Sequence, residues 1–472
     1  MDSTETARDD MPDSRTDANS DLKSNSAPLV TGSLWRAIWI MSWPLLLTTV
    51  ANSLVGMTDL YVAGKLGSIS QAAVGLSEQI IFMFLLFIMA TGTGTTALVA
   101  RHWGEGDREK AFNYTAQSLI MAVMLGAGLA LVSSLGAHFA LAPFTKSPEV
   151  TRLCTVYLGI FSLYMIPFSV ICITNAAFRA IGDARTPLAI VSTFTSLSIL
   201  GDILLVMHNW PIAGLGIRGI AYSALTASTI AATLALYKLS RSELAPSLRM
   251  VKRVIPEMIR RIVKIGIPSA LQRMAWATST FVLFFILARC PMPTEALASW
   301  TIGMRVEGLM FMPVMALSMA VSSIVGQNLG AREIERAYKA GWQVAGIGIG
   351  LLTVMAVALF LSSTLIANAF SKDPTTIAYV ISYLRINSLS EPFLALGMIL
   401  GGAFQGAGDT KTPMWITFLT NWVIRLPLAY FLALHLELGP TGAWWAMTLS
   451  VMIMGFLTAW RFRSRSWTEL HV

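Results

Sequence analysis

Long apolar segments alternate with short polar ones along most of the 472-residue chain. A helix that crosses the hydrocarbon core of a bilayer needs about 20 predominantly apolar residues, and runs of that length recur. Helices satisfy their own backbone hydrogen bonds in lipid. The pattern therefore predicts an all-α polytopic membrane protein with twelve spans, over about residues 35–60, 72–100, 111–137, 151–178, 187–208, 217–238, 262–288, 297–325, 338–362, 376–403, 413–434 and 441–461.

Composition supports a membrane protein, with 55% hydrophobic and only 13% charged residues and a mean hydropathy of +0.63. Soluble domains carry about 25% charged residues. The three cysteines, Cys154, Cys172 and Cys290, show no metal or redox spacing. The chain also lacks the motifs of ATP-binding loops and of common hydrolases. We therefore expect no cofactor, no metal and no enzymatic activity.

The first 33 residues are rich in Asp, Ser, Thr and Asn, which predicts a disordered polar tail. The segment lacks the basic-then-apolar order of a cleaved signal peptide, so the first apolar segment is expected to remain as a membrane helix. The predicted domains are a tail, an amino-terminal six-helix bundle, a basic cytoplasmic linker, a carboxy-terminal six-helix bundle and a cytoplasmic tail, over residues 1–33, 34–240, 241–261, 262–462 and 463–472.

Lys and Arg are distributed unequally between the two sides of the predicted membrane. Loops on the side of the N-terminus hold 21 of them, and loops on the opposite side hold 6. Because cytoplasmic loops carry the excess, we expect both termini in the cytoplasm of a bacterial inner membrane protein. The excess also accounts for the net charge of +8 without a nucleic-acid partner. Trp35, Trp39 and Trp43 share one helix face, where an interfacial belt is favoured over substrate stacking.

Two phrases repeat at a constant offset. FRAIGDARTP at Phe178 returns as FQGAGDTKTP at Phe404, and RHWGEGDREKA at Arg101 returns as QNLGAREIERA at Gln327, both 226 residues later. The chain is therefore interpreted as a duplication of six helices. An even number of helices returns each half to the same side, which predicts parallel repeats related by an axis along the membrane normal.

The first repeated phrase lies between predicted spans in each half. Gly182 and Gly408 predict tight turns there, and 186–187 and 412–413 are Thr-Pro pairs that predict N-caps followed by first helical residues. A sharp soluble turn is the favoured interpretation, and a direct gating role is the alternative.

These phrases, together with VGQNLGA at Val325–Ala331 and PLLLTTVANSLVGMTDLYVAGKLG in the first span, resemble multidrug and toxic compound extrusion (MATE) transporters. The resemblance covers about residues 35–460. Asp59, Asp202 and the RVEGLMFMP run at Arg305–Pro313 are most similar to the DinF-like branch. The resemblance implies two V-shaped bundles and antiport, in which cationic, often aromatic drugs leave while protons or sodium ions enter.

Charges at membrane depth are functional candidates because they are costly to bury. The amino-terminal half carries only acids, and the carboxy-terminal half carries four arginines and two glutamates. The repeat offset places leucines opposite the two aspartates, so cation handling is predicted in the amino-terminal half alone. The deep charges are Asp59, Glu78 and Asp202 in the first half, and Arg273, Arg305, Glu307, Arg385, Glu391 and Arg425 in the second.

Counting along the helices at 1.5 Å per residue places Asp59 about 33 Å and Asp202 about 22 Å from the cytoplasm, and Tyr157 about 9 Å from the outside. All three can therefore share the outer half of one cavity, with Ser198 on the same helix face as Asp202. Burial and like charge both disfavour the ionised form of a carboxyl group. Such a pair can exchange protons and compete for a cationic substrate.

Two residues of the first span are predicted to support this cavity: Pro44, which supplies a possible bend, and Asn52. The resemblance implies that the aspartates and Tyr157 form the family's amino-lobe cation site, with Ser198 where relatives often have Asn. Trp276 and Leu394 occupy the places of two acids of the sodium-linked branch. This difference favours proton coupling, with sodium as the alternative.

In the carboxy-terminal half, Glu391 and Arg425 lie near the midplane, where a structural ion pair is favoured over a substrate contact. Arg305 and Glu307 are predicted packing and hydrogen-bonding residues, and Glu78 is left undecided. Methionines and phenylalanines are numerous, 25 and 22 respectively. Core and lipid-facing positions are favoured for them over an adaptable substrate cleft.

The leading hypothesis is a proton-driven exporter of small cationic amphipathic compounds, working as a monomer among membrane lipids. A lipid-linked oligosaccharide flippase of the same superfold is the alternative, since deep arginines leave room for an anionic head group. A membrane-embedded enzyme is the third reading, which would need a cluster of catalytic groups. The histidines do not predict one, because separate segments hold His102, His138, His208 and His435.

Overall fold

The computed structural model describes residues 29–141, 147–207 and 215–470, and within these ranges the chain is helical without strands. The elements in order are α2 (Leu34–Lys65), α3 (Ser68–Glu105), α4 (Arg108–Leu141), α5 (Pro148–Ala180), α6 (Arg185–Asp202), α7 (Ile217–Ser240), α8 (Pro246–Met250), α9 (Pro256–Leu287), α10 (Pro293–Gly330), α11 (Ile334–Phe370), α12 (Pro374–Ser388), α13 (Glu391–Gly406), α14 (Lys411–Phe418), α15 (Leu426–Tyr430) and α16 (Pro440–Arg463).

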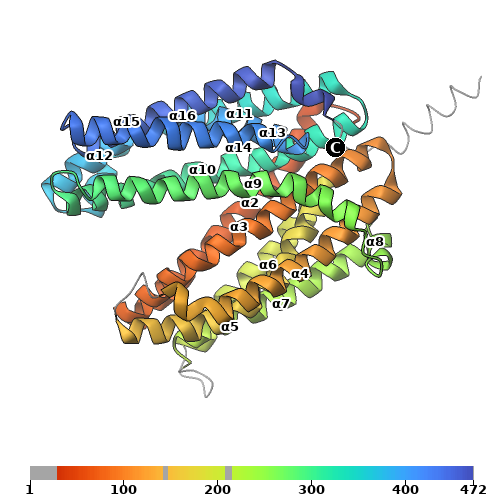
Figure 1. Cartoon of the computed structure of the whole chain (residues 1–472), viewed down its shortest axis with the longest axis horizontal. Helices are drawn as coiled ribbons and strands as arrows, with labels where there is room; N and C mark the ends of the chain where they lie inside the picture. Colours follow the sequence, from red (N-terminus) through yellow and green to blue (C-terminus); the bar gives the residue numbers. More distant parts are fainter. Residues whose placement is uncertain (1–28, 142–146, 208–214, 471–472) are drawn as a thin grey trace, which may run out of the picture.

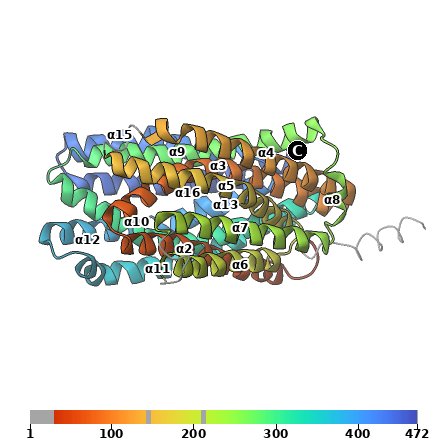
Figure 2. The same ribbon diagram turned by 90° about the horizontal axis from the view of Figure 1, so that it is seen from below.

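The helices form two bundles, α2–α7 and α9–α16, which meet at the end that holds the C-terminus and diverge toward the other end (Figure 1). Seen from below, the long helices of both bundles follow the long axis of the molecule (Figure 2). Within the described residues, 11 helices are long and apolar enough to cross a membrane. The predicted all-α polytopic fold is confirmed.

The duplication is visible in both lengths and turns. Helices α2 and α9 have 32 residues each, α3 and α10 have 38, and α7 and α16 have 24. The turn after α5 is closed by Asp183 N donating to Phe178 O at 2.9 Å, and the turn after α13 by Asp409 N donating to Phe404 O at the same distance. The repeat predicted from the sequence is therefore built with the same backbone hydrogen bonds.

The tenth predicted span, 376–403, is not one helix but two, α12 and α13, separated at Leu389–Ser390. Ser388 Oγ donates to Arg385 O at 2.7 Å, and Ser390 Oγ donates to Asn387 O at 2.8 Å. Serine hydroxyls that donate hydrogen bonds to helix carbonyls compete with the regular backbone hydrogen bonds of the helix. Pro392, two residues into α13, also lacks the N–H that would continue the ladder.

The fifth and eleventh spans both contain segments that depart from α-helical geometry. After Asp202 the chain continues as a π-helix over Ile203–Met207, and π-helices also occupy Leu419–Arg425 and Phe431–His435. Such wide turns interrupt the regular ladder and recur at functional sites. Two deep charged residues, Asp202 and Arg425, therefore stand next to irregular backbone.

Helices α2 and α9 each belong to both bundles. The start of α2, with Met41 and Leu45, is buried in the core formed by α10, α11 and α13, whereas its end, with Val62, is buried among α3–α7. Conversely, the start of α9, with Ile262, is buried in the first bundle, and its end joins the second. Pro44 and Pro268 lie near these changes of partner. The crossing helices hold the bundles together at the closed end.

Both terminal segments add to this closed end. Residues 29–33, assigned to the tail in the sequence analysis, pack on the second bundle, where Leu29 is buried and its carbonyl accepts from Asn328 Nδ2 at 3.3 Å. Beyond α16, Trp467 is fully buried and stacks on Phe462 at 4.6 Å between ring centroids. The remainder of the predicted tail, residues 1–28, lies outside the described residues, and the predicted linker 241–261 contains α8.

The repeated turns contain the predicted glycines but not the predicted caps. Gly182 and Gly408 have φ of +94° and +87°, in the left-handed region that glycine favours. Asp183 Oδ1, rather than Thr186, caps α6 by accepting from Arg185 N at 2.9 Å and Thr186 N at 3.0 Å. A carboxylate is favoured there because it also faces the positive end of the helix dipole.

The second repeat shows the same correction. Asp409 Oδ1 accepts from Thr412 N at 3.1 Å, and Thr412 itself donates its hydroxyl to Asp409 Oδ2 at 2.7 Å. Because α6 and α14 begin at Arg185 and Lys411, the prolines at 187 and 413 are third rather than first helical residues.

Replacing the cap should separate the two assignments. We expect Asp183→Ala to lower the free energy of unfolding by about 1 kcal/mol, because two backbone N–H groups lose their acceptor. Thr186→Ala should leave stability nearly unchanged. Thermal unfolding of both variants in detergent provides the measurement, and a larger effect of Thr186→Ala would restore the threonine cap.

Candidate functional site

Two buried aspartates face each other in the amino-terminal bundle. Asp59 lies near the end of α2 and is 7% exposed, and Asp202 is the last residue of α6 and is fully buried. Their side chains are close enough to interact electrostatically. The structure therefore brings together the pair that the sequence predicted from helix depth alone.

Packing among α2, α6 and α7 holds this pair in place. Thr195 Oγ1 on α6 donates to Ala51 O on α2 at 3.2 Å. Gly201 lets α7 approach α6, since a Cβ at that position would stand 2.5 Å from Ser223 Oγ. Asp202, the next residue, is thereby enclosed on one side by α7 and on the other by α2.

Tyr157 and Glu78 lie next to this pair of aspartates. We call the four residues Asp59, Glu78, Tyr157 and Asp202 the amino-lobe carboxyl cluster. Tyr157 on α5 is fully buried and lies within electrostatic range of all three acids, and its hydroxyl has no hydrogen-bond partner among the described residues. Glu78 on α3, undecided in the sequence analysis, interacts with Asp59. Ser198 is buried beside them with an unpartnered hydroxyl.

The two predicted supporting residues lie elsewhere on α2. Asn52 is exposed and its side chain makes no hydrogen bond within the described part of the chain, so the structure gives it no part in the cluster. Pro44 is buried in the segment of α2 that packs on the second bundle, where its carbonyl accepts from Thr48 Oγ1 at 2.8 Å. Pro44 therefore lies where α2 passes from one bundle to the other, and not beside the carboxylates.

The carboxy-terminal bundle contains a different network, and the predicted ion pair between Glu391 and Arg425 is wrong. No N–O distance between them is within 4 Å, although both residues are buried. Arg425 Nε donates to Ser450 Oγ at 2.8 Å, and its charge interacts with Glu307, which accepts from Tyr383 Oη at 2.8 Å. Because the helix is broken before α13, Glu391 lies in the first turn of a new helix. Its side chain therefore does not have the orientation expected from one continuous helix.

The other deep charged residues of the carboxy-terminal half agree with their predictions only in part. Glu307 packs and hydrogen-bonds as expected, but Arg305 is exposed and has no hydrogen bond to a described residue. Arg385 Nε donates to Ser363 Oγ at 3.0 Å, and Arg273 Nε is buried without a partner. Trp276 is 37% exposed.

The positions of the histidines bear on the enzyme alternative, and those of the tryptophans at the start of α2 bear on the substrate-stacking alternative. His102 stacks on Tyr114, and His435 stacks on Phe431, each at 5.2 Å between centroids. His208 and the side chain of His138 lie outside the described residues. Trp35 and Trp39 are 61% and 69% exposed, as interfacial positions require.

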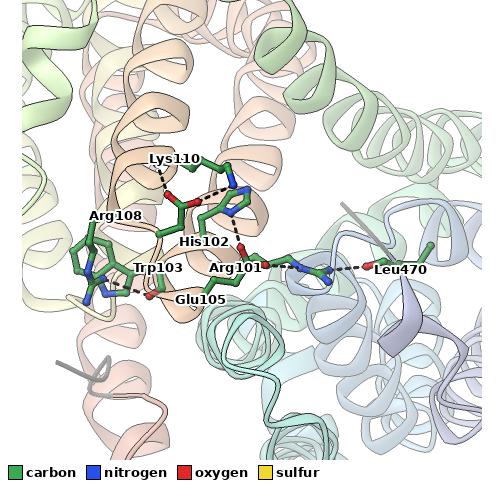
Figure 3. A network of polar contacts seen from close by, with 8 residues as sticks. Arg101, His102, Trp103, Glu105, Arg108, Lys110 and Leu470 are labelled. Carbon is green, nitrogen blue, oxygen red and sulfur yellow. Dashed lines mark hydrogen bonds and ion pairs between the residues drawn. The ribbon is translucent and has the colours of Figure 1, made fainter. Parts of the chain in front are cut away.

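Polar contacts join the bundles at their closed end. Gln327 Nε2 on α10 donates to Ala180 O at 2.6 Å, and Arg101 Nη1 on α3 donates to Leu470 O at 2.7 Å (Figure 3). Arg101 and His102 both also contact Glu105, at 3.5 and 2.8 Å. These bonds link the first bundle with the end of the chain and with α10.

Glycines make this end tight. A Cβ at Gly104 on α3 would lie 2.0 Å from Gln327 O, and a Cβ at Gly330 on α10 would lie 1.9 Å from Arg101 O. No larger side chain fits at such a distance without moving the backbone. The helices α3 and α10 are therefore in direct backbone contact here.

Two helical bundles that meet at one end and diverge at the other, with a buried acid cluster in one of them, are typical of a multi-pass membrane transporter. The chain belongs to the MatE family, whose family model matches residues 44–204 and 268–431. The two matched stretches fall in the two halves of the duplication.

Curated relatives match over almost the whole chain. The chain is 26% identical, over 435 residues, to a Thermotoga maritima protein named probable multidrug resistance protein NorM, covering 91% of this chain and 92% of that protein. It is 23% identical to the Bacillus subtilis uncharacterized transporter YisQ, covering 92% and 95% of the two chains.

Solved structures share the fold. A Pyrococcus furiosus MOP superfamily transporter, described as having a binding pocket of reverse polarity, aligns with a TM-score of 0.86 at 22% identity over 93% of this chain and 97% of that one. An outward-facing multidrug resistance MATE family transporter aligns with a TM-score of 0.87, also at 22% identity, over 93% and 98%.

The Glu307–Tyr383 hydrogen bond can be tested for stability. We expect Tyr383→Phe to reduce the free energy of unfolding by about 1 kcal/mol, because the partly buried Glu307 loses a hydrogen-bond donor. Tyr430→Phe, at a 55% exposed position, is the matched control. Equal thermal unfolding midpoints for the two variants would show that the bond contributes nothing.

Proposed function

We propose that the protein is a secondary active exporter of cationic amphipathic compounds, driven by the proton gradient across the bacterial inner membrane. The observation that carries this proposal is the amino-lobe carboxyl cluster, buried in one bundle of a MatE-family transporter. The relatives named as multidrug resistance proteins support the substrate class.

The cluster has the chemistry that antiport needs. As an anion, the Asp59–Asp202 pair attracts a cationic compound; once protonated, it loses that attraction. Two carboxyl groups that share a dry site disfavour a double negative charge. A proton and an organic cation therefore compete for the same pair, and the exchange of one for the other couples import to export.

Orientation follows from the basic loops. The end where the bundles meet carries residues 29–33, the segment after α16 and the Lys- and Arg-rich loops, so we place it in the cytoplasm. The bundles then diverge toward the outside, an arrangement shared in outline with the neighbour described as outward-facing. In this state the substrate leaves and a proton reaches the cluster.

Alternating access then requires the closed end to open. The contacts that must break are Gln327 to Ala180, Arg101 to Leu470, and the glycine contacts between α3 and α10. The repeated phrase at 178–187 contributes through its backbone, because Ala180 supplies a carbonyl to the opposite bundle. In this proposal the segment 178–187 forms a sharp turn and also takes part in closing the cytoplasmic end.

Proton coupling is preferred to sodium because Trp276 and Leu394 stand where the sodium-linked branch has acids. The flippase alternative gains little from the deep arginines. Of the four deep arginines, Arg305 is exposed, and Arg385 and Arg425 each donate to a different serine. Arg273 alone has a buried Nε without a partner among the described residues.

Transport in proteoliposomes tests the coupling site. A pH gradient alone should drive efflux of a fluorescent organic cation by the unmodified protein, and Asp59→Asn and Asp202→Asn should each reduce the rate at least tenfold, because neither amide can exchange a proton. Glu437→Gln, at an exposed acid outside the predicted spans, is the control. Undiminished exchange in both aspartate variants would refute the cluster, and efflux driven only by sodium would refute proton coupling.

A disulfide across the closed end tests alternating access. A Cβ at Gly326 would lie 2.9 Å from Ala100 Cβ, which is shorter than the roughly 3.5–4.5 Å that a disulfide spans. A small separation of α3 from α10 would therefore bring the two positions into bonding range. In a variant that lacks Cys154, Cys172 and Cys290, oxidation of the A100C/G326C pair should abolish transport.

A reductant should restore transport in the paired variant, and each single variant should stay active under oxidation. Full transport by the cross-linked protein would show that this end does not open.

A further inference from the structure

A groove on the membrane-facing surface of the carboxy-terminal bundle is not used by the proposed transport cycle. It has a volume of about 410 Å³ and lies between the start of α14 and the end of α16. Both helix ends are at the closed end of the molecule, beside the C-terminal segment. The groove therefore opens where membrane lipid meets water.

The lining of the groove is graded along its length. Lys411 and Arg461 lie at the end of the groove nearest the aqueous phase. Trp415 lies one helical turn deeper on α14, and Leu419 lies a further turn deeper. Because each turn advances about 5.4 Å, the lining changes from cationic to aromatic to aliphatic over roughly 12 Å. A phospholipid presents phosphate, glycerol and acyl chain in the same order.

The two cations are available to a ligand. Lys411 and Arg461 are exposed, and neither forms an ion pair or side-chain hydrogen bond with another described residue. The nearby acid, Asp409, is occupied by the backbone and hydroxyl of Thr412. Trp415 and Trp460 are 62% and 66% exposed, and tryptophan is favoured at the level of lipid head groups.

The duplication supplies an internal comparison. A groove of about 440 Å³ lies on α7, the counterpart of α16, and it is lined by Thr229, Ile230, Thr233, Leu234 and Tyr237. Tyr237 corresponds to Trp460, since both are the twenty-first residue of their helix. No Lys or Arg lines this second groove, so only the carboxy-terminal one combines cations with tryptophans.

We propose that the groove between α14 and α16 binds an anionic phospholipid, with its phosphate between Lys411 and Arg461 and its glycerol and upper acyl chains against Trp415, Trp460 and Leu419. Basic pockets at the cytoplasmic ends of membrane helices attract anionic head groups. The charge between α14 and α16 selects the anionic lipid over a zwitterionic one. The proposal does not depend on the transported substrate or the coupling ion.

Native mass spectrometry of the delipidated full chain tests the proposal. Titration with phosphatidylglycerol should show one site about tenfold tighter than for phosphatidylcholine, and the double variant Lys411→Gln/Arg461→Gln should lose most of that preference. The matched control is Arg185→Gln/Lys238→Gln, which removes the corresponding cations of the first repeat and should keep it. Thermal unfolding without lipid verifies that both variants are folded.

Other outcomes overturn the proposal. Equal losses in the two double variants, or no preference for phosphatidylglycerol, would mean that diffuse surface charge attracts the lipid. Displacement of phosphatidylglycerol by millimolar inorganic phosphate would assign the cations to a soluble anion. Retention of the preference in Lys411→Gln/Arg461→Gln would place the lipid elsewhere.

Discussion

The direct backbone contact between α3 and α10 is the constraint on which the arrangement of the two bundles depends. At Gly104 and Gly330 the helices approach so closely that a single methyl group would collide with a carbonyl oxygen. In lipid, helices gain little from hydrophobic burial against one another, so close packing of small residues and interhelical hydrogen bonds hold them together. Here both devices occur at one end, where Gln327 also reaches the opposite bundle. The other end is free to diverge, which gives the V shape.

Duplication supplied this symmetric frame, and substitution made its two halves chemically different. The first bundle gathers acids around Asp59 and Asp202, whereas the second surrounds Glu307 with Tyr383 and Arg425. A negative cluster without a nearby cation can exchange its charge for a proton. In the second bundle, Glu307 instead accepts a hydrogen bond from Tyr383 and lies within electrostatic range of Arg425. The same scaffold thus holds a cluster of acids in one half and an acid–tyrosine–arginine network in the other.

The first and last described segments of the chain are structural parts of the closed end. Leu29 lies on the second bundle, and Leu470 accepts a hydrogen bond from Arg101 of the first. With α2 and α9 crossing between the cores near their prolines, segments from the beginning, middle and end of the chain meet in one place. Any opening on this side must displace several of these contacts together, which favours two discrete states over a gradual change. The lipid groove between α14 and α16 lies beside this region, in contact with neither carboxyl network.

The sequence by itself determined the helical class, the duplication and the two central aspartates, because hydropathy, repeated phrases and charge at depth are written locally along the chain. The Asp caps at 183 and 409, the break before Glu391 and the partner of Arg425 were decided by the tertiary structure. So were the entry of Glu78 into the carboxyl cluster and the bond from Gln327 to Ala180. Each of these depends on which helix face turns toward a neighbour far away in the chain. That rotation is set by packing between helices, which no single segment encodes.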